Sequence, residues 1–422
     1  MTPSLYLLGK RRFLPLFATQ FLGAFNDNLF KTALVLFATY QIYNDPRVES
    51  DFNAVATGLF ILPFFLLSAL SGQLADTHDK AKIIRIVKTA EIAIMIFGAV
   101  GILLPSVPMM LGAVLAMGSH STFFGPIKYA ILPQHLAKAE VLGGTGLVEA
   151  GTYLAILGGT IAAGVIPGKW VALAVLLVAL AGWTTARFVP PAPPEGGAER
   201  VDWNIVKASI RLVSETMHIP RLFLAICSIS FFWTIGAVLI IEFPPLVKNV
   251  LTADKQVASL FLAIFSIGVA IGSVLINRML KGTVSARWAP GSVVLMGGFV
   301  LAFHFLARDW QGLPEGALYS FGEFILHPRA PLVFLALFGV AVTGGMFVVP
   351  LYAFLTTTVE KNQTARTVAA NNIVNSGAMV AGSLAVLTVN RMGVSVVDTL
   401  LIVAAMCLVA ALLGWKLHLA CD

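Results

Sequence analysis

Four residues suited to binding chemistry stand inside a long apolar stretch: Asn26, Asp27, Asn28 and Lys31. The apolar run around them, residues 13–42, is longer than the roughly 20 residues that cross a bilayer. A charge at membrane depth costs about 2.5 kcal/mol or more, so it is rarely left without a partner or a wet cavity. Asp27 and Lys31 share a helix face at four-residue spacing and can pair. We interpret the stretch as a polar site facing an internal cavity. The alternative is a self-neutralised pair beside two asparagines that join helices.

The composition indicates the class of protein. Hydrophobic residues make up 58% of the chain and charged residues 12%, with a mean hydropathy of +0.87. A soluble domain carries about twice that share of charge. The chain is therefore predicted to be a polytopic membrane protein. Its three cysteines have no metal-type spacing, so neither a zinc site nor a disulfide framework is expected.

Twelve membrane spans are predicted, and their even number puts both termini on one side. Lys and Arg residues outside the spans concentrate on that side, which the positive-inside rule assigns to the cytoplasm. We read the net charge of +7 as a topology signal and expect no nucleic-acid partner. The predicted spans are approximately 13–42, 54–75, 83–104, 108–132, 142–167, 169–190, 221–248, 256–278, 290–308, 331–356, 365–391 and 395–418.

A Pro-rich polar break divides the spans into six plus six. The expected parts are an N-terminal bundle (1–190), a cytoplasmic central loop (191–220) and a C-terminal bundle (221–422). A weak internal repeat at an offset of 223 aligns Gly159 with Gly382. This two-half layout indicates the major facilitator fold, an all-α membrane fold of 12 transmembrane helices in two six-helix halves.

The second span ends in a segment that carries Gly72, Asp76 and Lys80, a pattern that resembles the Gly-x-x-x-Asp loop of that superfamily. The resemblance implies that the aspartate caps a neighbouring helix and that the basic residues meet the cytoplasmic surface. Gly72 is expected to let helices approach closely. The alternative is a short solvated turn.

The fourth span contains Gly125 and Pro126, followed by Lys128. We expect Gly-Pro to break the helix, which is tolerated only where protein or a wet cavity satisfies the freed backbone groups. Lys128 is interpreted as a cation that faces the ligand. The alternative is a lysine that extends to the cytoplasmic interface.

Further polar residues occur in later spans. Glu149 in the fifth span and Asn372 in the eleventh are equivalent in the repeat, and Asn371 and Asn375 share one helix face. The remaining polar residues have simpler interpretations: a structural pair for Glu91 with Lys88, an interfacial position for Glu242, and packing or interface positions for His120 and His304.

Four segments together resemble the bacterial lysophospholipid transporter family of the major facilitator superfamily. They are residues 20–28 (QFLGAFNDN), 125–132 (GPIKYAIL), 146–150 (GLVEA) and 347–351 (FVVPL). The family's aspartate in the first span matches Asp27, its lysine in the fourth Lys128, and its glutamate in the fifth Glu149. Family members also carry a basic residue in the seventh span, where this sequence has none, and Lys31 is a candidate to supply that charge.

The resemblance implies a lysophospholipid flippase of the bacterial inner membrane, not an enzyme, without a cofactor or metal. It would move lysophosphatidylethanolamine and similar lipids from the outer to the inner leaflet for re-acylation. Its partners would be the lysophospholipid, membrane lipids and a cytoplasmic-side acyltransferase. The alternative function is a proton-coupled efflux carrier for drugs or other small molecules.

Overall fold

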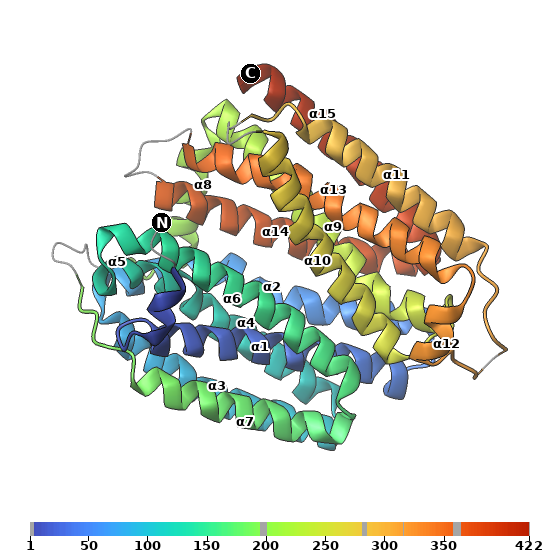
Figure 1. Ribbon diagram of the computed structural model, residues 1–422, viewed down its shortest axis with the longest axis horizontal. Coiled ribbons are helices and arrows are strands. Elements are labelled where there is room, and N and C mark those ends of the chain that lie inside the picture. Colours follow the sequence, from blue (N-terminus) through green and yellow to red (C-terminus); the bar gives the residue numbers. More distant parts are fainter. Residues whose placement is uncertain (1–3, 195–200, 281–284, 315, 358–363, 422) are drawn as a thin grey trace. The chain divides into compact units, whose positions relative to one another are not determined.

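The computed structural model describes residues 4–194, 201–280, 285–314, 316–357 and 364–421 (Figure 1). The described residues form helices and the segments that connect them. They contain no strand, and one isolated β-bridge joins Ala253 to Tyr319. The predicted all-α class is thus confirmed. Each of the twelve predicted spans coincides with a helix of 20 residues or more.

The contacts divide the chain into two compact units. Unit 1 comprises Met1–Leu34 and Leu62–Ala208, and unit 2 comprises Val35–Ile61 and Ser209–Asp422. Helices α1 (Leu14–Phe37), α2 (Pro46–Thr77) and α8 (Ile205–Met217) each contribute to both. The other elements of unit 1 are η1 (Ser4–Gly9), α3 (Lys80–Leu103), α4 (Val107–Ala130), α5 (Leu132–His135), α6 (Lys138–Val165) and α7 (Gly168–Arg187). Those of unit 2 are η2 (Ala38–Ile42), α9 (Pro220–Asn249), α10 (Lys255–Met279), α11 (Ala289–Arg308), α12 (Phe321–Leu326), α13 (Ala330–Thr357), α14 (Thr364–Arg391) and α15 (Val396–Cys421).

Ten of the described helices are long and apolar enough to cross a membrane. The other two long helices are α1, which carries the polar stretch around Asp27, and α6, whose segment Ala150–Val165 is apolar. A helix satisfies its backbone hydrogen bonds internally, as a segment in hydrocarbon must. The chain is a multi-pass membrane protein.

Two glycines that the repeat aligns occupy equivalent positions in the two units. A Cβ at Gly159 of α6 would lie 2.5 Å from the carbonyl oxygen of Phe25 on α1. A Cβ at Gly382 of α14 would lie 2.6 Å from Cγ2 of Thr234 on α9. The fifth span thus packs on the first as the eleventh packs on the seventh. Small residues permit this closeness, as is usual between membrane helices.

Helix α4 continues through Pro126 to Ala130, so the predicted break at Gly125-Pro126 is wrong. Proline lacks an N–H and leaves the carbonyl four residues earlier, that of Thr122, without its helical donor. Ser71 of α2 donates its hydroxyl to that carbonyl oxygen at 2.8 Å. The neighbouring helix therefore replaces the missing hydrogen bond, and the helix does not need to break.

The loop between α2 and α3 also differs from expectation. A Cβ added at Gly72 would meet no described atom within 4 Å, so this glycine does not mark a close helix approach. Asp79 is the N-cap of α3 and accepts from the backbone N–H groups of Ala81 and Ala192. Asp76 lies exposed near the end of α2, and Lys80 is buried in the first turn of α3.

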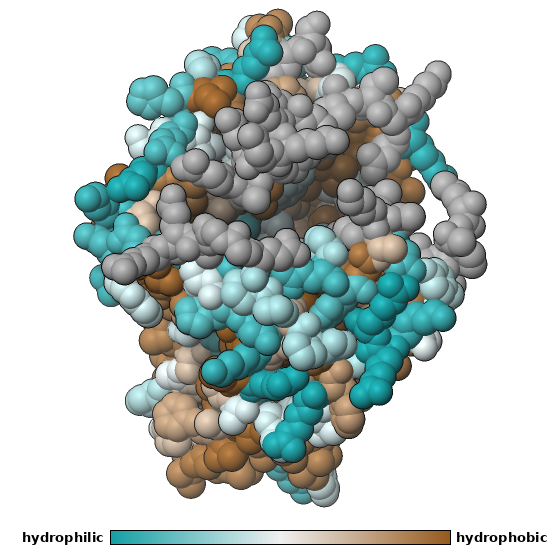
Figure 2. All heavy atoms as spheres, turned by 90° about the vertical axis from the view of Figure 1, so that its left-hand side faces the viewer, coloured by the Kyte–Doolittle hydropathy of each residue, from teal (hydrophilic) through white to brown (hydrophobic). Residues whose placement is uncertain are grey.

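Exposed cations of unit 1 gather where several of its helices begin or end. Lys10 and Arg11 precede α1, Lys82 lies in the first turn of α3, and Arg187 ends α7. Figure 2 shows this face, which lies on the left of Figure 1, with hydrophilic side chains over its lower half and apolar side chains along the lower edge. One end of unit 1 is thus polar while its flank is apolar, as a membrane-embedded bundle requires.

Candidate functional site

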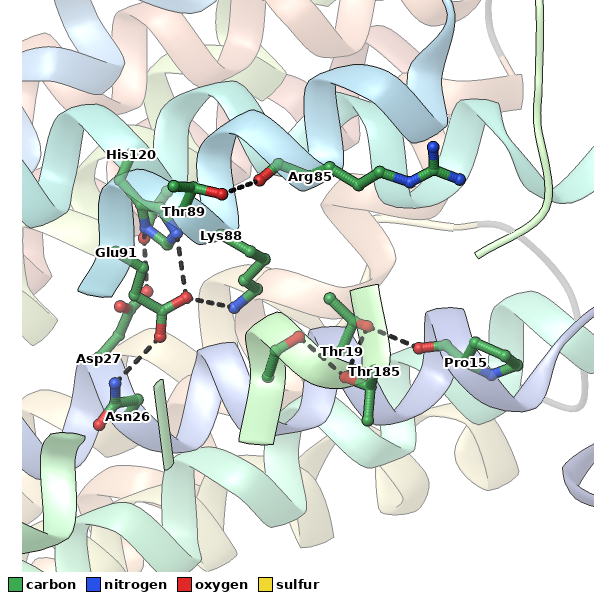
Figure 3. A network of polar contacts seen from close by, with 12 residues as sticks. Pro15, Thr19, Asn26, Asp27, Arg85, Lys88, Thr89, Glu91, His120 and Thr185 are labelled. Carbon is green, nitrogen blue, oxygen red and sulfur yellow. Dashed lines mark hydrogen bonds and ion pairs between the residues drawn. The ribbon is translucent and has the colours of Figure 1, made fainter. Parts of the chain in front are cut away.

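The polar stretch of α1 meets α3 and α4 inside unit 1 (Figure 3). Asn26 is fully buried, and its Nδ2 donates to Oε1 of Glu91 on α3 at 3.0 Å. Ser121 on α4 donates its hydroxyl to the carboxylate of Asp27. Successive residues of a helix point about 100° apart, so two adjacent side chains can reach two different helices. The sequence stretch therefore serves as a junction of three helices.

The partner of Asn26 belongs to a buried group of charged side chains. Nζ of Lys88 lies 2.5 Å from Oε2 of Glu91, and both side chains are almost fully buried. Nε2 of His120 on α4 lies 3.3 Å from the same Oε2. A Cβ at Gly23 of α1 would lie 2.5 Å from the Lys88 ammonium, so this glycine leaves the space that the lysine fills. We name Asn26, Asp27, Lys88, Glu91, His120 and Ser121 the α1 cluster.

The buried charges of the α1 cluster hold one another in place. Removing one member of a buried ion pair typically costs about 3–5 kcal/mol, because the other charge is left unpaired. The expected Lys88–Glu91 pair is confirmed, but it does not stand alone. His120, which we expected from sequence to be a packing or interface residue, joins the pair to Ser121 through its Nδ1, 3.3 Å from the serine Oγ.

Two acceptor oxygens of the α1 cluster have no hydrogen-bond donor among the described residues. Oδ1 of Asn26 and Oδ1 of Asp27 are buried and have no hydrogen-bond partner among the described residues. A buried acceptor left unpaired costs about 1–3 kcal/mol. A ligand that brings a donor, above all a cationic one, to Asp27 would recover that energy.

The other predicted residues of unit 1 lie at varied distances from the cluster. Asn28 donates to the carbonyl oxygen of Ala24 in its own helix at 2.8 Å, and half-buried Lys31 interacts electrostatically with Asp27. Lys128 follows Ser121 by seven residues on α4, which is about 10 Å along the axis. Its Nζ lies 4.8 Å from the ring centroid of Tyr129. The backbone of Glu149 belongs to α6, and its side chain falls outside what the structure describes.

Unit 2 contains a smaller polar cluster on α9, α13 and α14. Asn375 accepts from the hydroxyl of Ser230 at 2.6 Å and donates to the hydroxyl of Tyr352 at 3.4 Å. Nε1 of Trp233 donates to the same tyrosine oxygen at 2.7 Å. Asn371 is fully buried, and neither end of its amide has a partner within the described chain, whereas Asn372 is exposed. The three predicted asparagines therefore have three different environments.

Unit 2 also contains a buried ion pair, which joins the start of α2 to the end of α9. Nζ of Lys248 lies 2.6 Å from Oε1 of Glu49, whose side chain is fully buried. The same ammonium donates to the carbonyl oxygens of Thr39, within η2, and of Tyr43, directly after it. The sequence did not reveal this pair, because its members are far apart in the chain.

Glu242 lies near that pair on α9, and it is buried rather than interfacial as we expected from sequence. Its Oε1 accepts from the hydroxyl of Ser50 on α2 at 2.9 Å. Asn390 of α14 donates to that hydroxyl oxygen at 2.9 Å and to Asp51 at 2.8 Å. The start of α2 covers this part of α9, so the glutamate is enclosed by protein.

Comparisons with known proteins agree with this fold. The sequence model of the Major Facilitator Superfamily matches residues 16–383. The chain is 25% identical over 347 residues to the lysophospholipid transporter LplT of Escherichia coli (strain SE11), covering 80% of this chain and 78% of that protein. It is 26% identical over 359 residues to the LplT of Serratia proteamaculans (strain 568), covering 82% and 80%. Among solved structures, the POT family transporter PepTSo matches with a TM-score of 0.71 at 11% identity, covering 98% of this chain and 99% of that one.

Proposed function

The chain belongs to the major facilitator superfamily, and we propose that its substrate is a lysophospholipid with a zwitterionic headgroup. Its matched family and relatives are transporters, so the chain is a membrane transporter and not an enzyme. The name carried by the relatives in Escherichia coli and Serratia supports the lysophospholipid.

The observation that carries the proposal is the α1 cluster. It places acidic and basic side chains together in the interior of a membrane bundle, and it leaves one oxygen of Asp27 without a hydrogen-bond donor in the described chain. A carboxylate binds a charged ammonium donor about twice as strongly as a neutral donor. A group of side chains that carries charges of both signs suits a phosphate joined to an amine.

We assign the headgroup contacts by charge. Asp27 and Glu149 would meet the amine, and Lys31 and Lys128 the phosphate. The glycerol oxygens would meet the amide groups of Asn26, Asn28, Asn371, Asn372 and Asn375. The acyl chain would lie along apolar helix faces, entering through a lateral opening during rocker-type alternating access. Gly125 and Pro126 near the end of α4, Gly72 and Asp76 near the end of α2, and Lys80 at the start of α3 would serve the conformational change.

The proposed setting is the bacterial inner membrane with both termini in the cytoplasm. The excess of Lys and Arg on the side of the termini supports this orientation. Transport would run from the outer to the inner leaflet, where an acyltransferase could restore the missing acyl chain.

The proposal is tested by uptake of headgroup-labelled lysophosphatidylethanolamine into spheroplasts, with a panel of drug cations assayed beside it. We expect lysophospholipids of different tail lengths to compete with one another, and diacyl phospholipids to compete poorly. Export of drugs without lysophospholipid uptake would favour a proton-coupled efflux carrier instead. Equal competition by diacyl lipids would indicate a general scramblase.

A further inference from the structure

Ser121 contacts two titratable groups of the α1 cluster, Asp27 and His120. Its Oγ contacts the carboxylate of Asp27 on α1 and lies 3.3 Å from Nδ1 of His120. A serine hydroxyl has one hydrogen to donate. It can therefore donate to the aspartate or to the histidine, but not to both.

The other ring nitrogen of His120 is also constrained. Nε2 lies 3.3 Å from the Glu91 carboxylate, which in turn lies 2.5 Å from the Lys88 ammonium. The contact is an ion-pair contact whose geometry is not that of a hydrogen bond. An ionised carboxylate can only accept, so the ring nitrogen that faces it is expected to carry a hydrogen. The protonation state of His120 then depends only on whether Nδ1 also carries a hydrogen.

Two hydrogen arrangements fit these contacts, and they contain the same number of protons. In the first, Asp27 is ionised, Ser121 donates to it, and Nδ1 of an imidazolium His120 donates to Ser121. In the second, Asp27 is protonated and donates to Ser121, which donates to Nδ1 of a neutral His120. Conversion to the first moves the Asp27 proton to Oγ and the Ser121 hydrogen to Nδ1.

We infer that Asp27, Ser121 and His120 share one mobile proton, and that His120 is the site which takes it up when an ammonium group binds to Asp27. This inference rests on the proposed function, since it supplies the reason why a buried aspartate can ionise as the substrate arrives. No proton has to leave the membrane interior, because the proton moves within the cluster.

The charges around His120 agree with such a role. Lys88 and Glu91 on α3 neutralise each other, and the ionised aspartate on α1 balances the imidazolium. The cluster therefore keeps the same net charge in both arrangements. Lys31 is the further cation that interacts with Asp27, and it favours the ionised aspartate.

The inference predicts that the affinity for an amine headgroup depends little on pH in the wild type. Without His120, binding of an amine must release a proton from Asp27 to solvent. The affinity for amine headgroups should then rise by up to about tenfold per pH unit wherever Asp27 is protonated in the empty protein. The wild type should show little dependence over about pH 5–8, the range in which an ordinary histidine would titrate.

The test counts protons released when purified protein binds lysophosphatidylethanolamine, by calorimetry in buffers of different ionisation enthalpy. We expect close to none for the wild type and about one for His120→Gln. Ser121→Ala interrupts the path and should behave like His120→Gln, and the double variant should resemble either single one. Lysophosphatidylglycerol, which has no amine, should release no proton from any of them.

His304→Gln is the matched control, since His304 is buried in α11 with its Nδ1 2.9 Å from a backbone carbonyl oxygen. It should release as few protons as the wild type. A proton released by the wild type, or none released by both His120→Gln and Ser121→Ala, would overturn the inference. If the wild type binds no lysophospholipid, the proposed function fails. The inference is then tested by the same proton count with a cationic drug from the panel in place of lysophosphatidylethanolamine.

Discussion

Ser71 donates its hydroxyl hydrogen to the carbonyl oxygen of Thr122 at 2.8 Å, and Thr122 is the residue whose helical hydrogen bond Pro126 removes. A side chain of α2 thus completes the backbone of α4 close to the α1 cluster. The contact lies six residues before Lys128 on the same helix.

The Ser71 contact predicts an energetic coupling with Pro126. Ser71→Ala should lower the free energy of unfolding by about 1–3 kcal/mol, because the Thr122 carbonyl is left unpaired. Pro126→Ala restores the N–H, so Ser71→Ala should cost much less in that background. The measurement is the free energy of unfolding in detergent, with and without Ser71→Ala, in the wild-type and the Pro126→Ala backgrounds. Ser68→Ala is the control, as its hydroxyl donates to the Phe64 carbonyl of its own helix. Equal costs in the two backgrounds would contradict the coupling.

Gly159 is predicted to be intolerant of a side chain. Gly159→Ala places a methyl group 2.5 Å from the carbonyl oxygen of Phe25, so α6 must move away from α1. Overpacking of this kind typically costs about 1–3 kcal/mol. Gly72→Ala is the matched control, because its Cβ would meet no described atom within 4 Å. We expect Gly159→Ala to lower the unfolding temperature and Gly72→Ala to leave it unchanged. An unchanged unfolding temperature for Gly159→Ala would show that α6 can relax.

The pair formed by Glu49 and Lys248 is predicted to be worth more to stability than an exposed pair. Lys248→Met leaves the fully buried Glu49 carboxylate without its cation, at a cost of about 3 kcal/mol or more. Adding Glu49→Gln should recover much of that loss. Arg391→Met, at an exposed position of α14, should change the free energy of unfolding by about 0.5 kcal/mol or less. If the double variant is no more stable than Lys248→Met, the buried charge is not the cause.

The sequence was sufficient for the helices and for the position of Asp27, because both depend on local patterns of hydropathy. It was not sufficient for the partners of Asp27. His120 is a single histidine in an apolar segment, and only the packing of α4 against α3 brings it to Glu91. The continuity of α4 was missed for the same reason, since a hydroxyl from another helix offsets the local effect of Pro126.

Lys128 has two interpretations that transport can separate. If it binds phosphate, Lys128→Ala should abolish uptake and Lys128→Arg should keep part of it, because arginine preserves the charge but presents a broad planar fork. If it only reaches the interface, Lys128→Ala, Lys128→Arg and Lys128→Gln should all transport normally. Because α4 is already continuous, Pro126→Ala should leave Lys128 in place.

The most direct test of the central claim is leaflet transfer of headgroup-labelled lysophosphatidylethanolamine by the purified protein in liposomes. The account predicts faster transfer with the wild type than in protein-free liposomes. It predicts that Asp27→Asn, which keeps the hydrogen-bonding shape but loses the charge, reduces the added rate by about tenfold or more. A normal unfolding temperature for Asp27→Asn would show that the loss is not a folding defect. Wild-type rates in Asp27→Asn, or a wild type no faster than empty liposomes, would contradict the account.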